Sequence, residues 1–279
     1  MGEEPGGLRV LTLNLWHRSD DWSARRSAVV RGVSELAPDI IGFQEVEALV
    51  EADGRTANQA EEIAVQCGMP MTYGISHSSA LPGGRRRHFG NAVLSRFPVM
   101  RSTCRPLPDG RQDEPRSVLH CVLATPWGQV PVFVTHLAWR EDAGPDRVRQ
   151  VRALVQIVDE LCPPDAEGFP PVLLGDLNAG PEADEIRYLT GPSSPPSPDA
   201  RFVDAWTHGG VGPGYTFDPV NPFAALNEEP ARRIDYILVR GPGDAGPGRP
   251  RDPRLALAHP YDGVHASDHF GVVTNLEVP

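Results

Sequence analysis

The sequence predicts an α/β protein: two β-sheets packed face to face, with helices covering the outer faces, a four-layer α/β sandwich. Short apolar segments with strand character outnumber the helical segments. The helical segments also fall between pairs of strands instead of gathering at one end of the chain. No internal repeat or linker divides the 279 residues, so we expect one domain spanning residues 1–279.

The first half of the chain begins with a strand, a helix and a second strand. Residues 8–16 (LRVLTLNLW) alternate in the manner of a buried strand. Asp20 and Asp21 can cap a helix near 22–36, which Pro38 ends. Residues 39–46 then form a short apolar strand. The elements expected after it are a helix at about 57–67 and strands at about 71–77, 90–95, 116–125 and 129–137.

The second half contains the clearest helix, near 146–161. Pro145 suits its first turn, an apolar stripe recurs at helical spacing, and Pro163 and Pro164 end it. The segment PVLLGDLNA follows, with residues 172–174 as a buried strand, then a short helix near 181–190 and a Pro/Ser-rich loop at 191–199. The remaining expectations are strands near 202–206, 232–239 and 268–277, and an irregular surface excursion at 241–254.

Composition narrows the class of protein. No run of 18 apolar residues exists, which argues against a membrane-spanning helix. The N-terminus, MGEEPGGLRV, lacks the pattern of a signal peptide. The 4 cysteines match neither a metal-binding spacing nor a disulfide framework, so we expect buried free thiols. Free thiols favour a reducing compartment, and we expect a cytoplasmic protein.

Charge argues against a protein whose whole surface grips nucleic acid. All 26 basic residues are arginines, yet the net charge is -11. Neutralisation of backbone phosphates by basic side chains dominates nucleic-acid affinity, and a net negative charge opposes this neutralisation. A local basic patch remains compatible with the composition, and a site for divalent cations needs carboxylates in any case.

The segment PPVLLGDLNA (170–179) presents two polar residues at the tip of an apolar strand. Side chains two residues apart point to the same side of a strand, so Asp176 and Asn178 should lie together. One can orient a water molecule and the other the group to be cleaved. Gly175 is expected to permit a sharp turn or the close approach of a ligand. The alternative is an Asx-turn that only shapes the chain.

Polar residues recur at other strand ends, where open α/β sheets place ligands. Each taken alone has a structural explanation, but together they suit one chemistry: hard oxygen ligands fit Mg²⁺ or Mn²⁺, with phosphate oxygens completing the shell. The sequence contains neither a GxSxG elbow nor a GxxxxGK[ST] loop, which disfavours serine hydrolases and kinases. The residues concerned are Asn14, Glu45, His136, Asp235, Asp268 and His269.

The motifs LNLW, FQEV, GNAVLSRFPV, VTHL, GDLNA, RIDYILV and SDHFGV occur here in one order. In this order the chain resembles the endonuclease/exonuclease/phosphatase superfamily, with its deoxyribonuclease-I-like fold, from about Val10 to Val273. The resemblance implies hydrolysis of phosphate esters with Mg²⁺ or Mn²⁺ as cofactor, the metal acting as Lewis acid and template.

The resemblance also implies roles for individual residues. Glu45 would be the principal metal ligand, assisted by Asn14 and Asp268. Asp176 and Asn178 would position the attacking water and the phosphate. The remaining roles fall to three residues: His269, paired with Asp235, would act as base or charge stabiliser, and His136 would bind a phosphate oxygen or assist the leaving group.

Two departures from the family pattern concern the substrate. A polar residue usually precedes the GNAVLSR-like strand, and His88 is the candidate here. Substrate-grasping insertions of the DNA-acting members are not recognisable. Arg85, Arg86 and Arg87 could hold a phosphate or could form a solvated loop, and Arg116 could point into the same cleft.

The substrate therefore stays open. A phosphorylated small molecule, nucleotide or lipid head group is favoured, DNA or RNA cleavage by an endo- or exonuclease is the alternative, and a non-catalytic binding module is remote. His120 is expected in the core. Trp139 and Trp206 could line the substrate cleft, but packing in the core or at the rim is expected for both. Tyr215 and Phe217 are expected to anchor a loop near the site.

Overall fold

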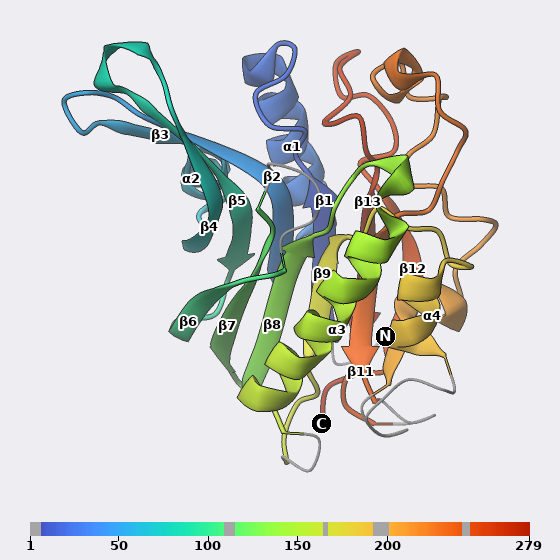
Figure 1. Ribbon diagram of the computed structural model, residues 1–279. Helices are drawn as coiled ribbons and strands as arrows, with labels where there is room; N and C mark the ends of the chain where they lie inside the picture. Colours follow the sequence, from blue (N-terminus) through green and yellow to red (C-terminus); the bar gives the residue numbers. More distant parts are fainter. Residues whose placement is uncertain (1–6, 109–114, 164–166, 192–200, 242–245) are drawn as a thin grey trace.

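The computed structural model describes residues 7–108, 115–163, 167–191, 201–241 and 246–279. Two sheets pack against each other, and helices cover their outer faces (Figure 1). The predicted four-layer α/β sandwich is confirmed. Among the described residues, no helix combines the length and apolar character needed to cross a membrane.

The larger sheet has the order β12-β13-β1-β2-β5-β4, with β3 paired to β2. Its central strands β1 and β2 are parallel, and the pairs around them are antiparallel. The carboxyl ends of β1 and β2 therefore meet at one edge. The strands are β1 (Leu8–Asn14), β2 (Ile40–Val50), β3 (Thr56–Asn58), β4 (Met71–Ala80), β5 (Arg86–Ser95), β12 (Pro250–Ala256) and β13 (Gly271–Leu276).

The smaller sheet has the order β10-β11-β9-β8-β7-β6. Strands β8 and β9 are parallel, and their register sets His136 beside Asp176. Strand β11 runs antiparallel to β9 and sets Asp235 on the other side of Asp176. The strands are β6 (Val99–Pro106), β7 (Ser117–Thr125), β8 (Gly128–His136), β9 (Val172–Asp176), β10 (Phe202–Asp204) and β11 (Asp235–Arg240).

Strand alternation divides the apolar side chains between layers. Leu8 and Val10 belong to the core between the sheets, together with Val134, Val172 and Leu174. The alternate residues of β1 face the helices over the larger sheet. A third cluster lies between the smaller sheet and its helices. Each sheet is therefore buried on both faces, which leaves its strand ends as the places where polar side chains gather.

The helices begin and end where the sequence indicates. Asp21 caps the first helix, Asn58 caps the second, and Gly68 ends the second in the left-handed conformation. Helices α1 (Trp22–Leu36) and α2 (Gln59–Cys67) cover the larger sheet, and α3 (Gly144–Leu161) and α4 (Asp184–Thr190) cover the smaller one. Short 3-10 turns are η1 (Pro82–Gly84), η2 (Glu141–Ala143), η4 (Ala205–His208) and η5 (Ala224–Asn227).

Several expected elements were wrong. Strand β12 occupies part of the segment 241–254 expected to be irregular, because it finds β13 as a partner. Strands β3 and β6 were not expected at all. Arg86, Arg87 and His88 belong to β5, in a hairpin with β4, so the arginine segment is not wholly a loop. Of the expected loop at 191–199, residues 192–199 lie outside the described part of the chain.

The cysteines are free, as expected, but only Cys121 is buried. Cys67 and Cys162 are half-buried and Cys104 is exposed, because it projects from the partly exposed strand β6. The prediction of buried thiols was therefore wrong for three positions.

Candidate active site

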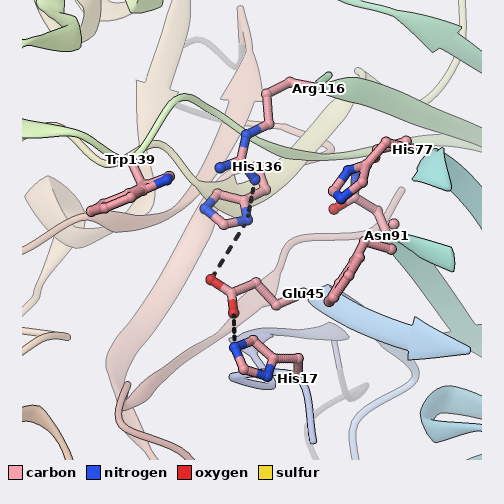
Figure 2. A pocket seen from close by; sticks show the side chains of 10 residues that line it. His17, Glu45, His77, Asn91, Arg116, His136 and Trp139 are labelled. Carbon is pink, nitrogen blue, oxygen red and sulfur yellow. Dashed lines mark hydrogen bonds and ion pairs between the residues drawn. The ribbon is translucent and has the colours of Figure 1, made fainter. Parts of the chain in front are cut away.

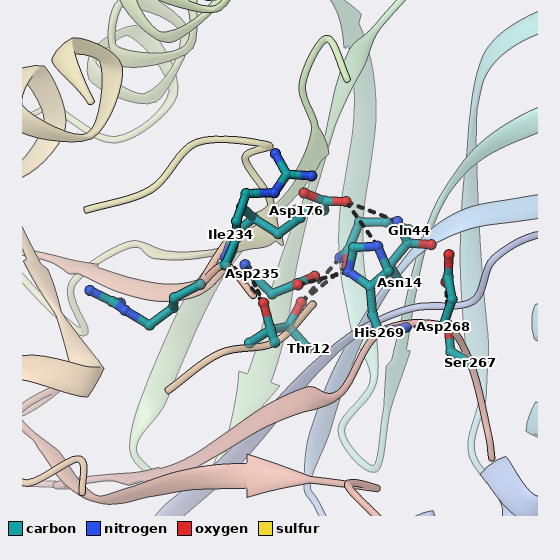
Figure 3. A network of polar contacts seen from close by, with 12 residues as sticks. Thr12, Asn14, Gln44, Asp176, Ile234, Asp235, Ser267, Asp268 and His269 are labelled. Carbon is teal, nitrogen blue, oxygen red and sulfur yellow. Dashed lines mark hydrogen bonds and ion pairs between the residues drawn. The ribbon is translucent and has the colours of Figure 1, made fainter. Parts of the chain in front are cut away.

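The strand ends bring the predicted residues together at one edge of the sandwich. Asn14 ends β1, His136 ends β8, Asp176 ends β9 and Asp235 begins β11. All four side chains are buried. The network in Figure 3 thus joins the two sheets, because Asn14 comes from the larger sheet and Asp176 and Asp235 from the smaller.

A β-bulge directs Glu45 into this network. The register of β2 against β5 shifts between Phe43 and Val46, and Glu45 has a positive φ of 52°. Ile41, Phe43 and Val46 all pack in the core beneath the helices. Without the extra residue, Glu45 would follow Phe43 to that face, so the bulge turns its carboxylate toward Asn14. Such strained conformations concentrate at functional sites.

Asn14 bridges two carboxylates. Its Nδ2 donates to Asp176 Oδ2 at 2.9 Å and to Glu45 Oε1 at 3.1 Å. Its Oδ1 accepts from the Trp16 amide at 2.9 Å, which fixes the orientation of the side-chain amide. In this arrangement Asn14 acts as a hydrogen-bond donor, and its role as a metal ligand stays a prediction.

Asp176 both shapes the chain and faces the site. Its Oδ1 accepts from the Asn178 backbone amide at 2.9 Å, which is the Asx-turn considered above, and Asn178 has a positive φ of 50°. Its Oδ2 faces Asn14. Gly175 is required by packing: an added Cβ would lie 2.3 Å from the Thr135 carbonyl oxygen. The neighbouring strand β8, and neither a turn nor a ligand, therefore explains this glycine.

His269 forms a buried pair with Asp235. Its Nδ1 lies 2.9 Å from Asp235 Oδ2, and its Nε2 lies 3.8 Å from Asp176 Oδ2. Burial alone would lower the pKa of His269, but the charges of Asp235, Asp268 and Asp176 raise it well above the ordinary value. In the metal-free protein these carboxylates favour the protonated imidazole, and Nε2 lies on the side of Asp176.

His136 is neutral and lies between Arg116 and Asn178. Burial, followed by the charges of Arg116 and His269, lowers the pKa of His136 well below its ordinary value. Arg116 Nη1 lies 3.1 Å from its Nδ1, and Asn178 Nδ2 lies 2.9 Å from its Nε2. Arg116 can only donate, so it donates to Nδ1, and the neutral ring carries its proton on Nε2. The Arg116 guanidinium and this N–H are donors of the kind that oxygen atoms of an anion accept from.

Two carboxylates hold protons more tightly than usual. Burial and then the charge of Asp235 raise the pKa of Asp176 to about 7, against the opposing effects of His269 and Asn14. Burial raises the pKa of Asp268 to about 6, with a further contribution from Glu45. Crowded buried carboxylates of this kind are stabilised by a cation.

The donor set fits a divalent metal ion. Asp176, Asp235 and His269 offer ligand atoms within 4.8 Å of one another, and a metal ion held by all three would require His269 to lose its proton. Among the described residues, nothing donates a hydrogen bond to the buried Asp235 Oδ1. Glu45 is the more open carboxylate, with 26% of its side chain exposed. Oxygen-rich surroundings favour a hard cation such as Mg²⁺ or Mn²⁺.

Glu45 also lines a cavity of about 250 Å³ (Figure 2). Polar residues form part of the wall, including Arg116 and His136, which were predicted from the sequence. Arg85, Arg86, Arg87 and His88 do not line it. His88 instead contacts Ser78 on β4, and Arg87 lies over the Phe89 ring. Their roles as substrate-binding residues stay predictions.

Other lining residues were not predicted. His17 lies in a loop whose backbone has a positive φ of 32°, and His77 comes from β4 beside Phe89. Trp139, expected to pack in the core or at the rim, is 50% exposed at this cavity. The positive φ at His17 is invisible in the sequence, whereas the alternation of Phe89 and Asn91 on β5 could have indicated two of the lining residues.

Buried Arg25 holds the loop that carries His17. Its guanidinium donates to the carbonyl oxygens of Leu15, His17 and Ala266, at 2.8, 2.7 and 3.1 Å. It also lies over the rings of Trp16 and Trp22. One helical arginine thus ties the residues after β1 to the segment that leads into Asp268.

The remaining expectations about aromatic residues are met in part. His120 is buried and stacks on Phe133 with ring centroids 4.4 Å apart, so it is a core histidine as predicted. Trp206 is also buried. Phe217 contacts the His269 ring edge-on at 5.2 Å, which confirms its place near the site. Tyr215 is 38% exposed.

Fold and site together define the class of protein: a four-layer α/β sandwich that gathers acidic, amide and imidazole side chains at one end of its two sheets. A model of the endonuclease/exonuclease/phosphatase family matches residues 11–269, and the chain belongs to this family. It is 28% identical over 252 residues to YbhP, an uncharacterised protein of Escherichia coli, a match that covers 86% of this chain and 87% of YbhP.

Solved structures show the same deoxyribonuclease-I-like fold. D. rerio TDP2 complexed with a single-strand DNA product has a TM-score of 0.74 and 18% identity, covering 97% of this chain and 99% of that one. The human Nocturnin catalytic domain with a bound sulfate anion has a TM-score of 0.72 and 18% identity, covering 98% and 95%. At such identities the likeness concerns the fold.

Proposed function

We propose that this protein is a divalent-metal-dependent phosphoesterase that hydrolyses small phosphorylated molecules. The observation that carries the proposal is the meeting of Asn14, Asp176 and the Asp235–His269 pair at 2.9 Å contacts beside the Glu45 cavity. Family membership supports the reaction class.

The chain's own residues suit the attack of water on phosphorus. Asp176, with a pKa of about 7, can accept a proton from water near neutral pH. Asn14 and the Asn178 amide hold this carboxylate in place. His269 lies beside it and, when protonated, can stabilise negative charge that develops on the phosphoryl oxygens.

A second group of residues suits phosphate binding. Arg116 and neutral His136 place donors at the wall of the cavity, and Asn178 lies 2.9 Å from His136 without lining the cavity itself. Glu45 would hold the metal, with Asp268 close enough for their charges to interact. The metal, when bound, would polarise the phosphoryl oxygen and orient the water.

Charge beyond the cavity supports a small substrate. Trp139 lines both the catalytic cavity and a neighbouring one of about 680 Å³. A polyanion that continued past Trp139 would meet carboxylates, which oppose its binding. Acidic residues outnumber arginines in that neighbouring cavity, where Arg232 pairs with Glu229 and Arg140 is the other arginine. Its acidic residues are Glu141, Asp142, Glu228 and Glu229.

Cleavage of nucleic acid is the second candidate function. The similarity to TDP2 complexed with single-strand DNA product favours it. The net charge of -11 and the carboxylates beside Trp139 count against it.

Hydrolysis assays distinguish the two candidates. Purified protein is incubated with Mg²⁺, Mn²⁺ or EDTA and with supercoiled DNA, single-stranded RNA, nucleotides, a phosphomonoester and a phosphodiester. We expect metal-dependent release of phosphate or alcohol from small substrates, lost in EDTA and in Asp176→Asn. Nicked DNA or degraded RNA without turnover of small substrates would instead support the nuclease.

A further inference from the structure

Trp139 is the exposed aromatic side chain of the catalytic cavity. It follows His136 by three residues on the segment after β8, and half of its surface is accessible. Arg140 covers one side of the indole at 5.6 Å. An exposed indole at a cavity offers a large, rigid face and an N–H group that a ligand can contact.

The other wall of the cavity is also aromatic. Phe89 and His77 stack with ring centroids 5.0 Å apart and an interplanar angle of 24°. Both come from the paired strands β4 and β5, where they lie in register. His17 meets the same Phe89 edge-on at 6.1 Å. Figure 2 shows Trp139 and His77 on opposite sides of His136.

Between these walls lie polar and charged groups. Arg116 and His136 supply the donors described above, and Glu45 supplies the open carboxylate. The cavity therefore combines a phosphate-binding end with two aromatic surfaces. A ligand that satisfies both has a planar ring close to its phosphoryl group.

We infer that the cavity selects phosphoesters that carry a planar ring, which Trp139 binds by stacking and which the Phe89–His77 pair contacts from the opposite wall. This inference rests on the proposed function and specifies its substrate class. The ring is either a nucleobase or an aryl group, since stacking is available to any π face. The aromatic walls of the cavity distinguish between substrates, whereas the phosphate-binding end binds the phosphoryl group that all phosphoesters share.

Binding of phosphonates tests the inference because their C–P bond resists hydrolysis. Phenylphosphonate is compared with methylphosphonate, and the phosphonate analogue of AMP with that of ribose 5-phosphate, by calorimetry in Mg²⁺. We expect the ring to strengthen binding about tenfold in at least one pair. Trp139→Ala should remove this preference and leave ringless ligands unaffected, whereas Trp139→Phe should retain most of it.

Tyr215→Ala is the matched control, because Tyr215 is a partly exposed aromatic residue that does not line this cavity. Phe89→Leu, which keeps apolar volume, tests the second wall independently. Equal affinity with and without the ring in both pairs, or an equal loss of both in Trp139→Ala, would overturn the inference.

The proposed function can survive that result. If ringless phosphonates bind and small phosphoesters are hydrolysed without ring preference, the ring-binding inference is wrong and the proposed function stands. If no phosphonate binds and no phosphoester is hydrolysed, the ring-binding inference and the proposed function are both wrong. A tenfold preference confined to one pair supports the inference and identifies the ring as nucleobase or aryl.

Discussion

Asn14 donates a hydrogen bond to Asp176 at 2.9 Å, across 162 residues of sequence and between the two sheets. The bond opposes the rise in the pKa of Asp176 that burial causes. Both side chains are buried, so neither can exchange this contact for water without a rearrangement.

Replacement of Asn14 tests this contact. Asn14→Leu should raise the pKa of Asp176 further and lower kcat about a hundredfold, in the range that general acid–base groups contribute. The pH–rate profile should move to higher pH, since Asp176 must be ionised to accept a proton. An unchanged profile would separate Asn14 from the reaction. Asn275→Leu is a control in the same sheet, on β13 and away from the cavity.

Asp176→Asn should abolish turnover and raise the melting temperature of the metal-free protein. The wild-type carboxylate is buried beside Asp235, and its removal relieves a costly buried charge. Thermal melts in EDTA measure the stability and phosphate release measures the turnover. A destabilised variant would show that Asp176 is primarily structural.

Stability should depend on pH through the His269–Asp235 pair. A histidine whose folded pKa is raised adds stability that is complete below its unfolded pKa, about 6.5, and is lost as pH rises through the folded value. The raised pKa of Asp176, about 7, acts in the same direction up to that pH. We therefore expect the free energy of unfolding, measured by denaturant titration in EDTA, to fall as pH rises above 6.5.

Asp235→Asn should flatten this dependence, because it removes the main charge that raises the pKa of His269. The exposed Asp184 provides a control, and Asp184→Asn should retain the wild-type slope. Identical slopes in all three proteins would mean that the pair does not titrate as described.

Glu45→Gln should weaken Mg²⁺ binding tenfold or more, as loss of groups that orient or form a metal site does. Calorimetric titration measures the affinity directly. Glu47→Gln is the matched control: it lies two residues along β2, is buried, and pairs with Arg18 and Arg87. Equal effects of the two substitutions would remove Glu45 from the metal site.

Arg116→Ala should raise KM about tenfold or more, because loss of a charged donor to phosphate costs about 1.5–3 kcal/mol. A combined Ala variant of Arg85, Arg86 and Arg87 should raise it less, since those residues do not line the cavity. The opposite order, from steady-state kinetics on one small phosphoester, would assign phosphate binding to the arginine segment.

Much of this architecture follows from local sequence patterns. Alternation in β1 predicts both its buried faces and the position of Asn14, and the strand–tip motif GDLN predicts Asp176 and Asn178 on one side. Family motifs identify the other site residues, although their assigned roles stay predictions.

The missed features depend on long-range contacts. Strand β12 exists because β13 pairs with it, and its Pro-rich sequence alone indicates a loop. The bulge at Glu45 and the positive φ of His17 arise from pairing and from Arg25, neither of which local patterns encode. The exposure of Trp139 depends on how distant segments pack around it, which local sequence patterns do not encode.

The most direct test of the central claim is hydrolysis of a small phosphomonoester in water enriched in heavy oxygen, with Mg²⁺, followed by phosphorus NMR. Attack of water on phosphorus predicts heavy oxygen in the released phosphate, at a rate that depends on metal and vanishes in Asp176→Asn. Heavy oxygen in the alcohol product, or release of no phosphate under any metal condition, would contradict the account.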